Sequence, residues 1–75
     1  MEKTVKDPIK KFGELVRKKR KQLKMTQLKL EKEKVISRKA INNIENGKSA
    51  CTIETASLLI NLFHITLEEL REIFY

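Results

Sequence analysis

The segment ISRKAINNIENGK, residues 36–48, decides the fold of this chain. Ile41 and Ile44 lie three residues apart, which is the spacing of one face of a helix. Asn is a mediocre helix former. A helix face that is only solvated needs charge alone, whereas a face that recognises a partner by hydrogen bonding uses Asn, Arg and Lys. The polar face of this short helix carries Arg38, Lys39, Asn42 and Asn43.

Both ends of this helix are marked by residues that cap helices. Ser37 is a favourable N-cap, because its hydroxyl can accept from a backbone amide of the first turn. The pair Asn46-Gly47 is a strong termination signal, since glycine adopts the left-handed conformation cheaply. The segment therefore predicts a helix from Arg38 to Glu45.

Two helices are predicted upstream. Asp7 and Pro8 suit a helix start, and apolar residues then recur at helical spacing, which predicts a helix over 8–23. Thr26 is the next N-cap and predicts a second helix from Gln27 to Glu33 or Lys34.

Two further helices are predicted downstream. Thr52 caps a helix that ends near His64, and Thr66 with Glu69 forms a capping box before a last helix from residue 67 onwards. No alternating strand pattern, repeat or linker is present. We therefore expect one all-α domain of five helices over residues 1–75, with residues 1–7 flexible.

The net charge of +7 is unevenly distributed. Residues 1–50 carry 16 Lys and Arg against 6 Asp and Glu, which gives +10, whereas residues 51–75 carry 1 against 4, which gives −3. A basic part joined to an acidic part suggests one side that faces a polyanion. The basic run RKKRKQLK, residues 17–24, fits either a solvated helix face or a source of long-range attraction to phosphates.

Several classes of protein lack their usual signals in this sequence. The single His64 and the single Cys51 lie far apart, so neither zinc-ligand spacing nor an internal disulfide is present. Paired carboxylates, a phosphate-binding glycine loop and a catalytic triad are also missing. We expect no enzymatic activity, cofactor, metal or small-molecule site. Without an apolar run of about 18 residues or a signal peptide, we expect no membrane contact and a cytoplasmic location.

The two central helices, joined by about three residues, describe a helix-turn-helix over residues 27–46. In that motif the second helix lies in the major groove of DNA. Arg and Lys side chains can donate to guanine O6 and N7, and Asn can pair with adenine N6 and N7. Asn43 lies about one turn beyond Lys39, so Arg38, Lys39 and Asn43 share one side of the helix.

With these residues in place, residues 12–74 resemble the Cro and lambda-repressor-like family, also called the XRE-type helix-turn-helix family. The matching segments are GELVRKKRKQLKMTQLKL, ISRKAINNIENGKS and TIETASLLINLFHITLEEL. The resemblance implies an ion pair between Arg20 and Glu45 that ties the first helix to the end of the third. It also implies base contacts from Ser37, Arg38, Lys39 and Asn43, and phosphate contacts from Thr26, Gln27, Asn46 and Lys48.

The sequence departs from the family pattern in and just before the turn. The family usually has a small residue at Glu31, an apolar residue at Lys34 and glycine at Val35. A β-branched residue suits a left-handed turn poorly. Either the turn takes another conformation, or Val35 fills the core position that Lys34 vacates.

These observations predict a sequence-specific regulator of transcription that binds double-stranded DNA. We expect a homodimer on an approximately palindromic operator, with a dimer surface drawn from Ile73, Phe74 and Tyr75. The alternative is a protein-interaction module of the same fold, such as an adaptor or an antitoxin-like partner. The segment LINLFHITLEEL is also similar to Rgg-type peptide-responsive regulators, so both an isolated regulator and the N-terminal module of a longer one fit the sequence.

Overall fold

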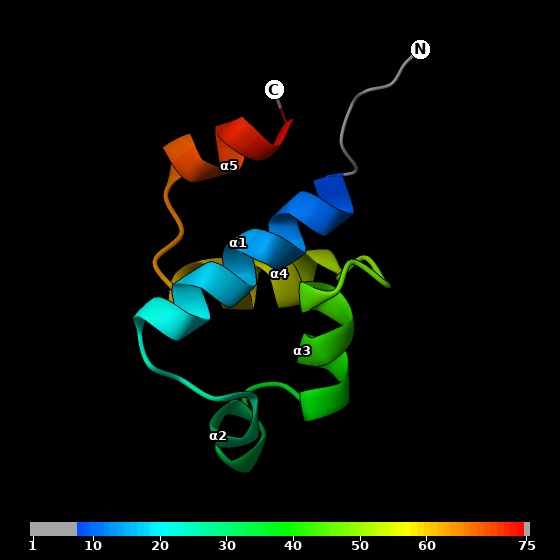
Figure 1. Cartoon of the computed structure of the whole chain (residues 1–75), viewed down its shortest axis with the longest axis vertical. Coiled ribbons are helices and arrows are strands. Elements are labelled where there is room, and N and C mark those ends of the chain that lie inside the picture. The colour runs from blue at the N-terminus through cyan, green and yellow to red at the C-terminus, as the bar shows by residue number, and fades with distance from the viewer. Residues whose placement is uncertain (1–7, 75) are drawn as a thin grey trace.

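The computed structural model describes residues 8–74, apart from the side chain of Phe74, and contains five α-helices in that range (Figure 1). Helix α1 packs against both α3 and α5, and α2 packs against α3. The expectations for residues 1–7 and for Tyr75 lie outside the described residues. The helices are α1 (Pro8–Gln22), α2 (Gln27–Lys32), α3 (Arg38–Glu45), α4 (Ile53–Leu62) and α5 (Leu67–Phe74).

The core lies between the first four helices and the residues that end α4. Ile41 and Ile44 of α3 are buried, as the spacing predicted. Burying a side chain of this size contributes about 1.5–3 kcal/mol each. The most completely buried side chains come from separate elements and are Val16, Leu30, Ile41, Leu59 and Phe63.

Helix ends in this chain are closed by residues in the left-handed conformation, three of which are not glycine. The φ angles are 58° at Lys24, 60° at Lys34 and 55° at His64, and 69° at Gly47. After α2, the Val35 amide donates to the Leu30 carbonyl, which is the bonding pattern of a Schellman motif. The early closure explains why α2 ends at Lys32, before the expected Glu33 or Lys34.

We expect Lys34→Gly to raise the stability of the domain by about 0.5–1 kcal/mol. A left-handed residue with a Cβ carries a steric cost that glycine avoids, and that gain exceeds the entropy glycine adds to the unfolded chain. Thermal denaturation should show a higher Tm. The matched control is Lys32→Gly inside α2, which should lower stability by about 1 kcal/mol. Equal losses in both variants would contradict the prediction.

Gly13 lets α1 and α3 approach closely. A Cβ built at this position would overlap the carbonyl oxygen of Ile44 and lie 3.0 Å from its carbonyl carbon. The last turn of α3 therefore rests directly on the backbone of α1. Any larger residue here must displace one of the two helices.

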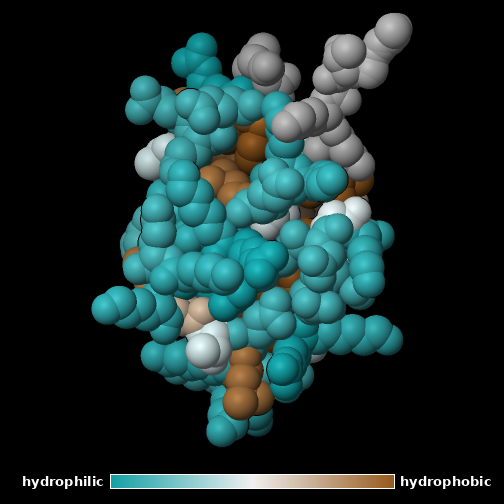
Figure 2. Space-filling model, viewed as in Figure 1, coloured by the Kyte–Doolittle hydropathy of each residue, from teal (hydrophilic) through white to brown (hydrophobic). Residues whose placement is uncertain are grey.

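Two apolar residues at the starts of helices are exposed, and one near the end of the described chain is buried. Ile53 and Leu67 begin α4 and α5 and are 88% and 71% exposed, because the first turn of each helix extends beyond the core. Ile73 is only 7% exposed. Its burial within the chain corrects its expected place on a dimer surface. Figure 2 shows that hydrophilic residues cover most of the viewed face. No helix among the described residues has the length and apolar character needed to cross a membrane.

Candidate nucleic-acid interface

A buried ion pair fixes the end of α3 to α1. Arg20 Nε donates to Glu45 Oε2 at 2.7 Å, and a second guanidinium nitrogen donates to Glu45 Oε1 at 3.1 Å. Arg20 and Glu45 are 9% and 6% exposed. This parallel, two-bond geometry is the strongest form of an Arg–carboxylate contact. It is the pair that the family resemblance implied.

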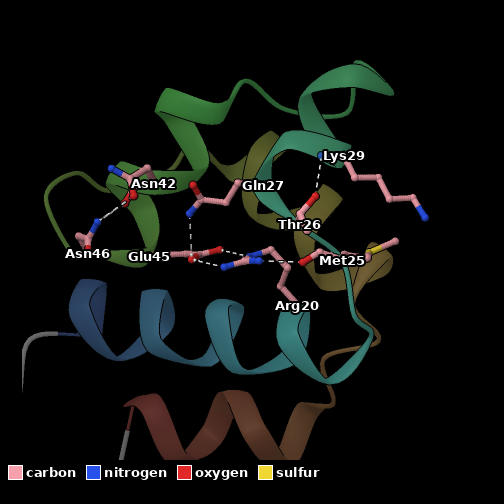
Figure 3. Close-up of polar contacts among 8 residues, drawn as sticks. All are labelled: Arg20, Met25, Thr26, Gln27, Lys29, Asn42, Glu45 and Asn46. Atoms are coloured by element: carbon pink, nitrogen blue, oxygen red, sulfur yellow. Dashed lines mark hydrogen bonds and ion pairs between the residues drawn. The ribbon is translucent and has the colours of Figure 1, made fainter.

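Two further hydrogen bonds extend this contact to α2 (Figure 3). The third guanidinium nitrogen of Arg20 donates to the Met25 carbonyl at 2.7 Å, which holds the α1–α2 connection. Gln27 Nε2 donates to Glu45 Oε1 at 3.2 Å, which braces the first residue of α2 against the last residue of α3. The buried charges are therefore paired and hydrogen-bonded, as burial requires. Together these contacts fix both helices of the motif to α1.

Two side chains from outside the helix satisfy amides at the start of α3. Ser37 Oγ accepts from the Ala40 amide at 3.1 Å, as a helix cap does. Glu31 Oε2 accepts from the Arg38 amide at 3.0 Å across the turn. Sequence reasoning recognised Glu31 as a departure from the family but missed this role. The contact spans seven residues, and no local pattern specifies it.

The polar face of α3 lies between two shallow hollows. Arg38 and Lys39 are exposed and Asn43 is half-buried. On one side, Arg38 and Lys39 line a hollow with Gln27 and residues of α2. On the other side, Lys39 and Asn43 line a hollow with Ser37 and the segment 49–52. Since Lys39 borders both hollows, the expected base-contacting side chains of α3 form one continuous surface.

The four side chains expected to contact phosphates differ in whether their polar groups already have partners within the protein. Thr26 Oγ1 accepts from the Lys29 amide at 3.0 Å, which leaves its hydroxyl hydrogen to donate (Figure 3). Gln27 uses its amide nitrogen on Glu45. Asn46 Nδ2 donates to the carbonyl and the side-chain oxygen of Asn42, at 2.9 and 3.1 Å. The exposed Lys48 ammonium makes no ion pair within the described part of the chain.

The turn before α3 combines both alternatives that the sequence left open. Lys34, not Val35, takes the left-handed conformation. Val35 is half-buried and packs against the core cluster. The left-handed position therefore lies one residue earlier than the family pattern places its glycine, and the apolar position moves from Lys34 to Val35.

An ion pair joins the acidic part of the chain to the basic α1. Lys19 Nζ lies 2.9 Å from Glu69 Oε2, which holds α5 against α1. The Thr66 backbone amide and the Lys19 ammonium lower the pKa of Glu69. Burial raises the pKa of the Cys51 thiol, which keeps it protonated and poorly nucleophilic. Within residues 8–74, no three His, Cys, Asp or Glu side chains gather closely enough to hold a metal ion.

We expect Glu69→Gln to lower the Tm at neutral pH, because the variant loses the charge that pairs with Lys19. The folded-state pKa of Glu69 lies below its unfolded value, so its contribution is full above the unfolded pKa and is lost as pH falls through the folded one. The Tm difference should therefore disappear in acid. The neighbouring Glu68→Gln is the control, and its difference should be small at every pH. A pH-independent difference for Glu69→Gln would contradict this account.

A comparison with known protein families identifies the class of protein to which this chain belongs. The family described as helix-turn-helix matches residues 16–70, which include α2, the turn and α3. The fold and this match define a DNA-binding protein of regulatory type. The chain belongs to the XRE-type helix-turn-helix family of Cro and the lambda repressor. Neither the curated proteins nor the solved structures gave a significant match. The similarity to Rgg-type regulators stays a prediction.

Proposed function

We propose that this protein is a sequence-specific, double-stranded-DNA-binding regulator of transcription, with α3 in the major groove. The observation that carries the proposal is the arrangement of α3. Ile41 and Ile44 on its apolar side are buried, and the Arg20–Glu45 pair fixes its end. Within the described structure, Arg38 and Lys39 on its polar side are exposed. A helix held rigidly with its hydrogen-bonding side exposed suits direct contact with base edges.

The exposed side of α3 supplies the specificity in this proposal. Arg38 and Lys39 donate to guanine O6 and N7, and Asn43 pairs with adenine N6 and N7. Ser37 accepts from an amide of α3 but keeps its hydroxyl hydrogen, so it can donate to a base acceptor. Each well-formed contact discriminates against a wrong base by about 1–3 kcal/mol.

Residues beside α3 supply the contacts to phosphates. Among the described residues, the Thr26 hydroxyl hydrogen has no acceptor and the Lys48 ammonium has no ion-pair partner. Gln27 reaches a phosphate through the second hydrogen of its amide nitrogen while it holds Glu45. Asn46 reaches a phosphate by giving up one of its two contacts to Asn42, which are to the backbone carbonyl and to the side-chain oxygen. Such contacts release counterions, so the affinity falls steeply with salt.

A homodimer on a palindromic operator remains part of the proposal. The half-sites would lie about one helical turn of DNA apart, roughly 34–36 Å. Because Ile73 is buried within the chain, the proposed dimer surface does not include it. Sedimentation with and without a selected duplex tests the stoichiometry of two chains per site.

Arg38→Ala and Lys48→Ala should separate base recognition from phosphate binding. For Arg38→Ala we expect lost discrimination at one base pair, worth about 1–3 kcal/mol, with most binding to unrelated duplexes retained. For Lys48→Ala we expect an equal loss of affinity for all duplexes. The slope of log affinity against log salt concentration should become smaller in magnitude by about one. The measurements are dissociation constants for selected and scrambled duplexes. Uniform weakening in both variants would refute the assigned roles.

A second candidate function is a protein-interaction module without sequence preference. Two observations favour it: the Glu31 carboxylate lies on the polar surface, and the Asn46 amide is already paired. Selection from random duplexes distinguishes the two functions. An enriched sequence supports the regulator, whereas weak, salt-sensitive binding with no enrichment supports the interaction module.

A further inference from the structure

Glu31 is an acidic residue on a surface that otherwise offers hydrogen-bond donors and cations. Its side chain is exposed on α2 and borders α3. DNA is a dense polyanion, so a carboxylate at this place weakens binding to phosphates. The other residues that line the same hollow are Gln27, Arg38, Lys39 and Asn42.

A hydrogen bond to the backbone fixes where the charge lies. Glu31 Oε2 accepts from the amide of Arg38, the first residue of α3, at 3.0 Å. Ser37 Oγ accepts from the Ala40 amide. Of the three amides that begin α3, only that of Lys39 lacks a side-chain acceptor in the described structure. The anionic carboxylate therefore occupies the positive end of the helix dipole.

An uncovered helix N-terminus is a ready site for phosphate of any sequence. If α3 offered such an end, DNA backbones would compete with base edges for the part of the helix that should contact bases. The Glu31 carboxylate fills this place and repels a phosphate that approaches it. Specificity is a difference between two affinities, and repulsion of the wrong partner increases it.

We propose that Glu31 is a specificity-determining residue that excludes DNA phosphates from the N-terminus of α3 and thereby lowers binding to non-cognate DNA. This inference rests on the proposed function, in which that end of α3 meets base edges. On a cognate site the carboxylate faces the groove, where the amino groups of cytosine and adenine are donors that it tolerates. The Glu31 carboxylate therefore lowers the affinity for non-cognate DNA more, because phosphates approach the helix end there.

The decisive variant is Glu31→Gln, which keeps the size of the side chain and an oxygen that can accept from Arg38 but removes the charge. A duplex is first selected from random sequences with the wild-type protein. Dissociation constants are then measured for that duplex and for a scrambled duplex at several salt concentrations. We expect Glu31→Gln to tighten binding to the scrambled duplex about three- to tenfold at low salt and to the selected duplex less. The difference should shrink at high salt.

Glu33→Gln is the matched control. It changes the net charge equally and lies beside α2, but the Glu33 side chain makes no hydrogen bond to α3 within the described residues. It should tighten both duplexes equally. The ratio of the affinities for the selected and the scrambled duplex decides the outcome. If Glu31→Gln leaves this ratio unchanged, or if Glu33→Gln changes it as much, the inference is overturned and the proposed function stays intact. If the wild type selects no sequence, the proposed function fails, and this inference fails with it.

Discussion

Glu45→Ala should lower the free energy of unfolding by about 3–5 kcal/mol, which is the largest loss that we expect from any single substitution outside the apolar core. The variant leaves the Arg20 guanidinium buried and without its carboxylate partner. It also removes the acceptor for Gln27, so the end of α3 loses its links to both α1 and α2. Small domains have little stability in reserve, about 5 kcal/mol or less. Glu45→Ala should therefore be largely unfolded at 37 °C.

Urea denaturation followed by circular dichroism measures this loss. The informative control replaces both partners by apolar residues of similar length, as in the double variant Arg20→Met with Glu45→Leu. It leaves no unpaired charge and should recover most of the stability, because buried ion pairs gain little over well-packed apolar groups. A Glu45→Ala variant within about 1 kcal/mol of the wild type would show that water or rearrangement compensates the Arg20 charge.

Gly13→Ala should lower the stability by about 1–3 kcal/mol or more. In an ordinary helix position the same change raises stability by about 1 kcal/mol. The sign reverses here because the new methyl group meets the backbone carbonyl of Ile44, which cannot rotate away as a side chain can. The unfolding transition should move to lower urea concentration.

The same substitution should also weaken DNA recognition, since α3 must shift to make room for the methyl group. Relative to the wild type, the variant should lose more affinity for a selected duplex than for a scrambled one. Lys18→Ala, at an exposed position of α1, is the control and should leave the fold intact. A Gly13→Ala protein at least as stable as the wild type would show that α1 and α3 separate at little cost.

The helix boundaries were largely predictable because caps act over three or four residues. Ser37 and Thr52 cap the helices that they were expected to begin, and the Asn46-Gly47 pair ends α3 as predicted. Thr66 and Glu69 form their capping box, with bonds in both directions. Each of these signals is complete within one short segment, so the sequence alone specifies it.

The contacts that position α3 depend on tertiary packing and were less predictable. No pattern near Gly13 indicates that the Ile44 carbonyl would lie against it. The bond from the Arg38 amide to Glu31 depends on the angle between two helices. The left-handed residue at Lys34 also resisted prediction, because lysine carries no preference for that conformation. The Arg20–Glu45 pair was expected only through the family resemblance.

In the described part of the chain, three helices are followed by left-handed residues that carry a Cβ, at Lys24, Lys34 and His64. In evolutionary terms, a glycine at any one of these positions is a route to greater stability that the chain has not taken. Most substitutions in a folded domain cost stability. A lineage that first acquired glycine at one of these helix ends could accept such costs and remain folded. Under the proposed function, such a lineage could change the exposed residues of α3, and with them the operator that it prefers, without loss of the fold.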